Sequence, residues 1–151
     1  MGELPDANFW LALAWSAHVA HPVAKSWWEA DAPRRIVFCR ITEMALLRLL
    51  TNRAILGDEA KTQAGAWGIY EQLRLSPRVE FLGETADFNQ HWRKISSRDS
   101  SATQRWSDDY LAAFARAQDL RVVTFDAGFR SYPNLAVELL VAPPPKIFDP
   151  K

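Results

Sequence analysis

Four acidic residues stand where predicted strands give way to predicted helices: Asp6, Glu43, Asp108 and Asp126. Asp6 follows a short first strand, and Asp126 ends a Val-Val-Thr-Phe strand. Glu43 lies in the first turn after an Ile-Val-Phe strand, and Asp108 opens a Leu-Ala-Ala helix. In an open parallel sheet, ligands bind beyond the carboxyl ends of the strands. The four positions are far apart in the sequence, so only the fold can gather these carboxylates, and we expect it to do so.

A cluster of carboxylates favours a divalent metal ion. Carboxylates that share a partly dry cleft raise one another's pKa values unless a cation supplies compensating charge. Oxygen ligands favour Mg²⁺ or Mn²⁺ over zinc, because no Cys or His cluster accompanies these acids. Mg²⁺ readily takes substrate phosphates as further ligands, so the pattern indicates hydrolysis of a phosphodiester by a metal-activated water. Asn8 and Thr124, each two residues from an acid, are predicted to orient the ligands through hydrogen bonds.

Each acid taken alone also has an ordinary structural interpretation. Asp and Glu are frequent in first helical turns because they favour the positive end of the helix dipole, which suits Glu43 and Asp108. Asp126 precedes an Ala-Gly pair and is typical of a turn, and Asp6 is compatible with an Asx-turn. The metal-site hypothesis therefore depends on all four acids falling at one predicted sheet edge.

Short β-branched runs alternate with longer helical segments along the chain, which is typical of βαβ units. We therefore predict an α/β fold with a central, mainly parallel sheet and helices on both faces. Strands are expected at residues 3–5, 35–38, 79–82, 121–125 and 137–141. Helices are expected at residues 8–15, 23–30, 42–50, 59–73, 86–95 and 108–118, with Pro22 in a first turn and Ser107 as an N-cap. Residues 96–105 are predicted to form a polar loop, and residues 143–145 an extended tail.

The composition fits one globular domain over residues 1–151, with 48% hydrophobic and 24% charged residues. Lys plus Arg number 18 and Asp plus Glu also number 18, which excludes a histone-like binder. The single cysteine, Cys39, cannot form an internal disulfide, and the first residues lack the pattern of a signal peptide. No apolar run approaches the ~20 residues that a membrane helix needs. We therefore expect a cytoplasmic protein without a membrane segment.

Three segments resemble the PIN-domain ribonucleases, most closely the VapC-type toxins of toxin–antitoxin pairs. They are LPDANFWLAL, RITEMALLRLLTN and WSDDYLAAFARAQDLRVVTFDAGF, and the similarity covers nearly the whole chain. In that family an Asp with an Asn two residues later closes the first strand, which matches Asp6 and Asn8. A Thr-Glu or similar pair opens a helix in the family, which matches Thr42 and Glu43.

The later motifs of the family also have counterparts here. Its third acid stands three residues before the Leu of a D-x-x-L-A-A helix, which selects Asp108 and leaves Asp109 as a neighbour. Its fourth acid ends a V-T-x-D-x-x-F stretch, which matches Asp126, with Thr124 and Phe129 around it. One departure is the short, proline-containing first strand, MGELPD, in place of a longer apolar run.

The resemblance implies a three-layer α/β/α PIN-like domain that acts as a Mg²⁺- or Mn²⁺-dependent endoribonuclease and slows translation. It further implies an RNA substrate, a co-encoded antitoxin protein that neutralises the enzyme, and a homodimer. Asp6, Asp108 and Asp126 would hold the metal, with Glu43 helping to position metal or water and Thr42 beside it.

Other residues suggest additional contacts. Arg98 and Arg105 flank the polar loop ahead of Asp108 and are candidate contacts for an RNA backbone, although loop arginines are often only solvated. The seven tryptophans are expected in the core or at an interface, with stacking on RNA bases as the alternative. His18 and His21 lack further soft ligands for a zinc site.

Two other classes of function place an Asp after the first strand of an α/β domain. Haloacid-dehalogenase-type enzymes need a second Asp where Asn8 stands, and receiver domains need a late lysine, but none lies between Lys94 and Lys146. A PIN-fold or other α/β binding module without catalytic activity is the remaining alternative. The presence of an acid at all four motif positions argues against that alternative.

Overall fold

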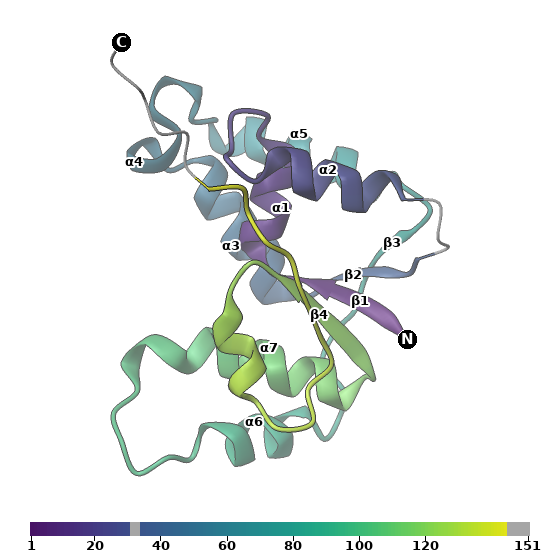
Figure 1. Cartoon of the computed structure of the whole chain (residues 1–151), viewed down its shortest axis with the longest axis vertical. Helices are drawn as coiled ribbons and strands as arrows, with labels where there is room; N and C mark the ends of the chain where they lie inside the picture. Colours follow the sequence, from purple (N-terminus) through teal and green to yellow (C-terminus); the bar gives the residue numbers. More distant parts are fainter. Residues whose placement is uncertain (31–33, 145–151) are drawn as a thin grey trace.

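A five-stranded parallel sheet forms the centre of the structure, a computed structural model that describes residues 1–30 and 34–144 (Figure 1). The strand order is β3-β2-β1-β4-β5, and every neighbouring pair runs parallel. The strands are β1 (Gly2–Pro5), β2 (Ile36–Phe38), β3 (Val79–Phe81), β4 (Leu120–Thr124) and β5 (Val137–Leu139). This arrangement confirms the predicted α/β class and parallel sheet. The predicted tail at residues 143–145 lies partly outside the described residues.

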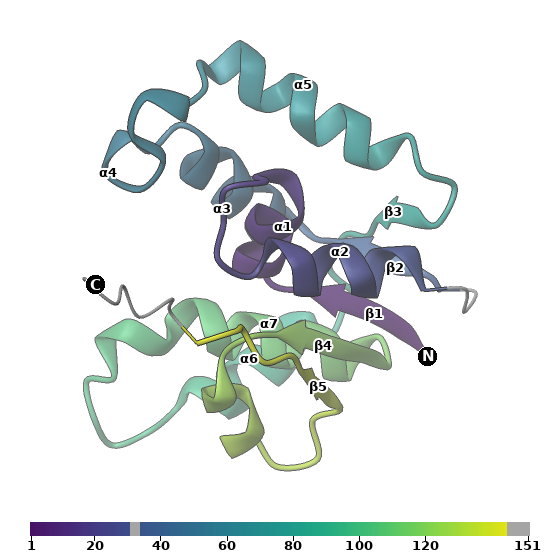
Figure 2. The same cartoon turned by 45° about the horizontal axis from the view of Figure 1, so that its top comes forward.

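Helices cover both faces of this sheet (Figures 1 and 2). One side carries α1 (Ala7–Ala14), α2 (His21–Glu29), α3 (Arg40–Leu50), α4 (Arg53–Leu56) and α5 (Gln63–Arg74). The other side carries α6 (Phe88–Ser96) and α7 (Trp106–Ala117). The chain also contains three short 3-10 helices, which are η1 (Gly57–Glu59), η2 (Thr103–Arg105) and η3 (Ala127–Ser131). The three layers are those of the predicted α/β/α domain. Among residues 1–30 and 34–144, no helix has the length and apolar character needed to cross a membrane.

Alternate side chains of each strand point to opposite faces and divide the core in two. On β2, Ile36 and Phe38 pack with α1, α2, α3 and α5, whereas Val37 packs with α6 and α7. On β4, Val123 joins the first cluster and Val122 the second. All five side chains are fully buried. Apolar residues at successive positions are what a strand needs when both faces of its sheet are covered.

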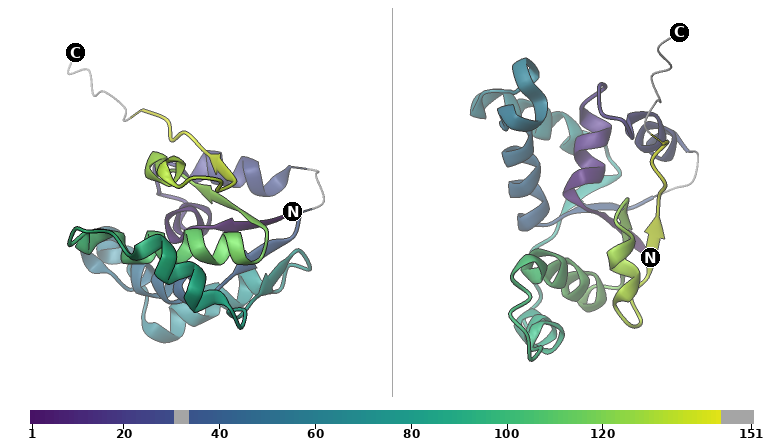
Figure 3. Two further views of the ribbon diagram at one scale, coloured as in Figure 1. Left: turned by 90° about the horizontal axis from the view of Figure 1, so that it is seen from below. Right: turned by 60° about the vertical axis from the view of Figure 1, so that its left-hand side comes forward.

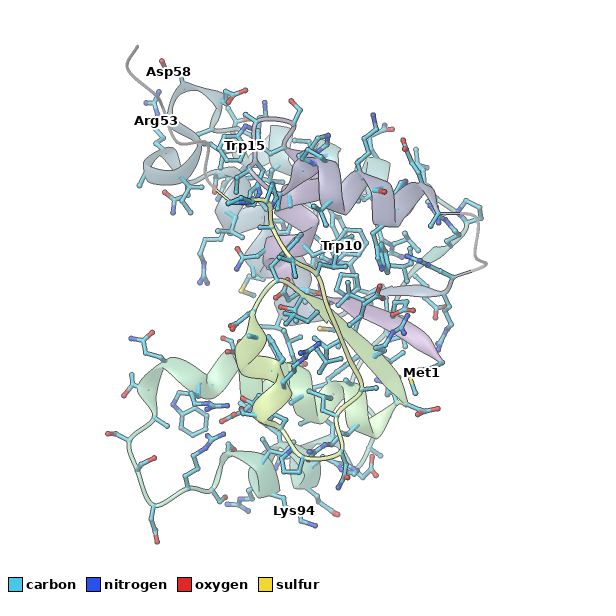
Figure 4. The ribbon with its side chains drawn as sticks, viewed as in Figure 1. Met1, Trp10, Trp15, Arg53, Asp58 and Lys94 are labelled. Carbon is cyan, nitrogen blue, oxygen red and sulfur yellow. The ribbon has the colours of Figure 1, made fainter. Side chains whose placement is uncertain are left out.

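The tryptophans are divided between the core and the surface. Trp10 lies in the interior (Figure 4), where its ring stacks on Phe38 with centroids 4.0 Å apart. Trp27 is also buried, but Trp67 and Trp106 are 45% and 53% exposed. The expected core role therefore fits the first two tryptophans, while the last two lie on the surface.

All six predicted helices begin one to four residues away from their expected starts, and two of these differences show how the starts are capped. The helix expected at 59–73 begins later because the Thr62 hydroxyl accepts the Gly65 N–H at 3.0 Å and caps α5. Helix α7 begins one residue before Ser107, with Arg105 at the N-cap position and no side-chain cap. The 3-10 turn η2 runs directly into α7, so Ser107 lies inside the helix rather than capping it.

The loop between α6 and α7 projects from the body of the molecule (Figures 1 and 3) and is anchored by a buried carboxylate. Asp109 is 1% exposed and accepts hydrogen bonds from both terminal nitrogens of Arg98, at 2.6 and 2.7 Å. The Tyr132 hydroxyl donates a third hydrogen bond to it. Burial raises the pKa of Asp109, but the hydrogen bonds from Arg98 and Tyr132 outweigh burial and hold that pKa below its usual range. Asp109 therefore ties the loop, α7 and the segment after η3 together.

The neighbouring aspartates of α7 should respond differently to loss of charge. We expect Asp109→Asn to lower the free energy of unfolding by about 2–3 kcal/mol, because it breaks a buried charge-assisted pair with Arg98. Asp108→Asn is the matched control, since the half-buried Asp108 side chain forms no hydrogen bond or ion pair with the described residues, and it should change stability by less than about 1 kcal/mol. Urea unfolding of the two variants checks this difference. Equal losses in both variants would contradict the anchoring role.

Candidate active site

The carboxyl ends of β1 and β4 mark the point where the sheet changes its direction of growth. From β1 the chain adds β2 and β3 on one side, and then β4 and β5 on the other. Asp6 directly follows β1, and Asp126 lies two residues beyond the end of β4. The first turn of α7 brings Asp108 to the same edge. Such switch points are where open parallel sheets bind their ligands.

A cavity of about 150 Å³ opens at this edge, and we call it the acidic cavity. Asp6, Asp108 and Asp126 line it from three different elements, together with Asn8 and Thr42. Its other lining residues are Ala7, Ile41, Ala45, Ser107, Leu111 and Phe129. The fold therefore gathers three carboxylates that the sequence holds far apart, and it surrounds them largely with small or apolar side chains.

Asp6 is the most buried of the three aspartates, at 7% exposed. Its Oδ1 accepts the Phe9 N–H at 3.0 Å, which caps α1, and its Oδ2 accepts the hydroxyl of Thr124. The Thr124 oxygen in turn accepts the N–H of Asp126 at 2.9 Å. Burial raises the pKa of Asp6 to about 6, the bonds from Thr124 and Phe9 oppose this rise, and the charges of Asp108 and Asp126 add to it.

The other two aspartates are more open to solvent. Burial raises the pKa of Asp108, the neighbouring Asp126 raises it further, and Arg105 opposes both. Asp126 is exposed, and its Oδ1 accepts the Gly128 N–H at 2.8 Å at the start of η3. A side chain at Gly128 would bring its Cβ within 3.0 Å of that oxygen, so the glycine allows this turn to close tightly. The carboxylates are thus near enough to repel one another.

Glu43 is not among the residues that line the acidic cavity, so the structure brings three of the four predicted acids together there. On α3, Thr42 and Ala45 stand three residues apart and share the face that lines the cavity. Glu43 is turned by about 100° from Thr42 around the helix. Its Oε1 accepts a hydrogen bond from Arg40 at 2.5 Å. Burial raises the pKa of Tyr70, on α5, to about 12, and the nearby Glu43 carboxylate adds to this rise. Helical phase therefore directs Glu43 toward α5 and leaves three aspartates at the site.

The residues predicted to orient the acids differ in their roles. Thr124 donates its hydroxyl hydrogen to Asp6. Thr42 instead caps α3, since its hydroxyl accepts the Cys39 N–H at 3.1 Å and donates to the Cys39 carbonyl at 3.0 Å. Asn8 lines the acidic cavity from an exposed position in the first turn of α1.

The arginines proposed as RNA contacts lie elsewhere. Arg98 and Arg105 line a separate, larger cleft beside η3 rather than the acidic cavity. Asp109, which holds Arg98 in place, was not among the predicted functional residues. The helical spacing indicated that Asp109 is buried, because it shares a helix face with Ala112 and Ala113, which are fully buried.

The donor set of the acidic cavity fits a hard divalent cation. All three charged groups are carboxylates, and no histidine or cysteine lines the cavity. Within the described ranges, no group of three His, Cys, Asp or Glu side chains is arranged so that it could hold an ion alone. Mg²⁺ needs only one or two protein carboxylates and keeps several waters, so these aspartates fit Mg²⁺ or Mn²⁺ better than a tetrahedral zinc site.

The raised pKa of Asp6 predicts a pH-dependent stability. The pKa of Asp6 is near 3.8 in the unfolded chain and about 6 in the folded protein. The stabilisation that protonated Asp6 gives the folded state is therefore fully present below about pH 4 and is lost as the pH rises through about 6. Without divalent metal, Asp6→Asn should therefore raise the free energy of unfolding near pH 8 by up to about 3 kcal/mol, since Asn also serves as an N-cap. Urea unfolding in EDTA near pH 4 and near pH 8 measures this gain, which should vanish at the lower pH. A gain independent of pH, or a loss near pH 8, would contradict the assignment.

Comparisons with known proteins agree with this geometry. The family model of the PIN domain matches residues 4–135. Ribonuclease VapC41 of Mycobacterium tuberculosis is 40% identical over 142 residues, covering 91% of this chain and 97% of that protein. Ribonuclease VapC38 of the same species is 26% identical over 147 residues, covering 91% and 96%.

Solved structures show the same fold. Mycobacterium tuberculosis VapC20, described as a sarcin-ricin loop cleaving toxin, gives a TM-score of 0.62 at 22% identity, covering 86% of this chain and 94% of that chain. VapBC2 from Rickettsia felis, bound to a DNA fragment from its promoter, gives a TM-score of 0.62 at 16% identity, and the match covers 92% of this chain and 98% of that chain. These two likenesses confirm the PIN-like fold, and the family model and the VapC41 identity confirm the resemblance seen in the motifs. The chain therefore belongs to the PIN-domain family, as a protein of the VapC type.

Proposed function

We propose that this protein is a Mg²⁺- or Mn²⁺-dependent endoribonuclease and the toxin of a toxin–antitoxin pair. The observation that carries the proposal is the convergence of Asp6, Asp108 and Asp126 on one cavity at the switch point of the sheet. Relatives named ribonucleases across nearly the whole chain support the RNA substrate.

The aspartates of the acidic cavity have different roles in the proposed reaction. A bound divalent ion would activate a water and stabilise negative charge on the phosphoryl oxygens. Thr124 and the Phe9 N–H fix both oxygens of Asp6, so this carboxylate is oriented before any ion arrives. The α7 backbone positions Asp108, and the turn at Gly128 positions Asp126. Asp6 and Asp108 are the proposed main ligands, and Asp126 contributes charge at the open side.

A binding module without catalytic activity explains the site less well. A carboxylate as buried as Asp6 lowers stability when ionised, and two further aspartates beside it increase that cost. Helix capping alone is served equally well by Asn or Ser at this position. The loss of stability caused by the ionised Asp6 is explained if its charge is needed to bind a cation that in turn contacts the substrate.

A co-encoded antitoxin and a second copy of the chain are the proposed protein partners. The VapBC complexes among the structural neighbours support the antitoxin. The homodimer follows from the family resemblance.

Loss of one site aspartate should abolish toxicity while the fold persists. We expect induced wild-type protein to stop bacterial growth and to leave discrete RNA fragments, whereas Asp108→Asn should lower activity roughly a hundredfold or more. Growth and total RNA followed together measure this, with Asp99→Asn in the exposed loop as the matched control. Discrete fragments from folded Asp108→Asn at the wild-type rate would contradict the assignment of this site.

Divalent metal should stabilise the wild-type protein through Asp6 and Asp108. At a concentration of Mn²⁺ about a hundredfold above its dissociation constant, binding adds roughly 2.7 kcal/mol, which appears as a higher Tm that EDTA reverses. The rise should be smaller below about pH 6, because Asp6 then binds a proton. Thermal unfolding of wild type, Asp6→Asn and Asp109→Asn in parallel checks the site, since only Asp6→Asn should lose the response. An equal rise in all three proteins would place metal binding elsewhere.

A further inference from the structure

A second cleft, of about 680 Å³, lies between α6, α7 and the segment after η3. We propose that it binds the phosphodiester backbone of the RNA on one side of the cleavage site. This inference rests on the proposed ribonuclease function. We call the site the basic cleft and define it by His91, Lys94, Arg98, Arg105 and Arg116.

The basic cleft concentrates positive charge in a protein whose formal net charge is zero. Four lysine or arginine side chains and one histidine line it, and none of its lining residues is acidic. The hydroxyls of Ser131 and Tyr132 add neutral hydrogen-bonding groups to its wall. A neutral protein must hold a polyanion through such a local patch, because its overall field gives no attraction.

Two of these guanidinium groups are held in place before any ligand binds. Asp109 accepts a bidentate pair from Arg98, and Arg105 lies 4.0 Å from the same carboxylate. Arg105 also lies over the Tyr132 ring, 5.0 Å from its centroid, and donates to the Ser131 hydroxyl at 3.3 Å. The Arg98 and Arg105 side chains stay 30% and 39% exposed, so both remain partly open to solvent. Fixed guanidinium groups suit phosphate oxygens.

The other lysine and arginine of the cleft have no partner of opposite charge among the described residues. Neither Lys94 nor Arg116 forms an ion pair with any carboxylate in residues 1–30 and 34–144. The Arg116 Nε is buried and has no hydrogen-bond acceptor among those residues. His91 differs, since its Nε2 lies 3.1 Å from Asp87 outside the cleft.

The basic cleft and the acidic cavity share two elements. On η3, Asp126 stands at the start and Phe129 lines the acidic cavity, while Ser131 at its end lines the basic cleft. At the start of α7, Arg105 faces the basic cleft and Asp108 faces the acidic cavity. A nucleic-acid strand with one phosphate at the acids can therefore pass over η3 and place its next phosphates among the cations.

A single-stranded RNA explains these features better than an acidic protein segment. The cleft opens beside a site whose three carboxylates would repel acidic side chains but would receive a phosphodiester together with a metal ion. Phosphates repeat along a strand, so several cations gathered in a cleft beside the acidic cavity match the repeated charge of its backbone.

The test is binding of a fluorescein-labelled, mixed-sequence single-stranded RNA in EDTA, followed by fluorescence anisotropy over a range of KCl concentrations. The variant is Lys94→Gln with Arg116→Gln, and the matched control is Arg53→Gln with Lys61→Gln, which removes the same charge from exposed positions. Arg53 and Lys94 lie at opposite ends of the molecule (Figure 4). Cleavage of cellular RNA by the wild-type protein with Mn²⁺ is measured alongside.

We expect the cleft variant to bind roughly tenfold more weakly and to lower the slope of log affinity against log salt by about 1.4, or about 0.7 for each lost phosphate contact. The control should retain the wild-type slope. If the cleft variant binds with wild-type affinity and slope while the wild-type protein cleaves RNA, the basic cleft is overturned and the ribonuclease function stands. If the wild-type protein neither binds nor cleaves RNA, both proposals fail. If the double variant does not fold, Lys94→Gln alone replaces it, because Lys94 is exposed. The slope of log affinity against log salt should then fall by about 0.7.

Discussion

The buried hydroxyl of Thr124 is the contact on which the arrangement of the acidic cavity depends. It donates to the Asp6 carboxylate and accepts the Asp126 N–H, so it joins the chain after β1 to the chain after β4. Thr124 is fully buried, and its hydrogen bond to Asp6 is buried with it. Because β1 and β4 pair along the whole of β1, from Gly2 to Pro5, their register fixes where both aspartates emerge. The sheet thus sets the spacing of the site, and Thr124 orients its most buried carboxylate.

At the start of α7, three charged residues close together in the sequence lie in three different surroundings. Arg105 faces the basic cleft, Asp108 faces the acidic cavity, and Asp109 is buried beneath Arg98 and Tyr132. Successive residues of a helix point about 100° apart, so adjacent aspartates meet different surroundings. Their pKa values move in opposite directions for this reason: that of Asp108 is raised by burial and Asp126, and that of Asp109 is held low mainly by its hydrogen bonds from Arg98. Adjacent identical residues can therefore have unrelated roles.

Strand ends were the most predictable part of this molecule. Short apolar runs located β2, β3, β4 and β5, whereas β1 has no such run. The rule that parallel strands present their carboxyl ends at one edge then indicated Asp6 and Asp126. Asp108 followed from the family motif and from its place in a first helical turn. The absence of Glu43 from the cavity lining was not predictable, because one position along a helix turns a side chain from one neighbour to another, and only the packing of α3 on α5 fixes that phase. The basic cleft was only partly predictable, since Lys94 and Arg116 join Arg98 and Arg105 through packing of α6 on α7.

Opposite charges in this protein are separated across a single short element. The acids gather on one side of η3 and the cations on the other, although the total charge cancels. Without a cation, the acidic cavity repels phosphate, so of the two sites only the proposed basic cleft would attract RNA. A divalent ion bound as proposed would compensate the aspartates and favour the ionised form of Asp6, whose burial raises its pKa to about 6. The cavity would then attract phosphate as the basic cleft does. Metal binding should therefore turn two opposed sites into one continuous path for a polyanion, which couples the loading of the metal to the binding of the substrate.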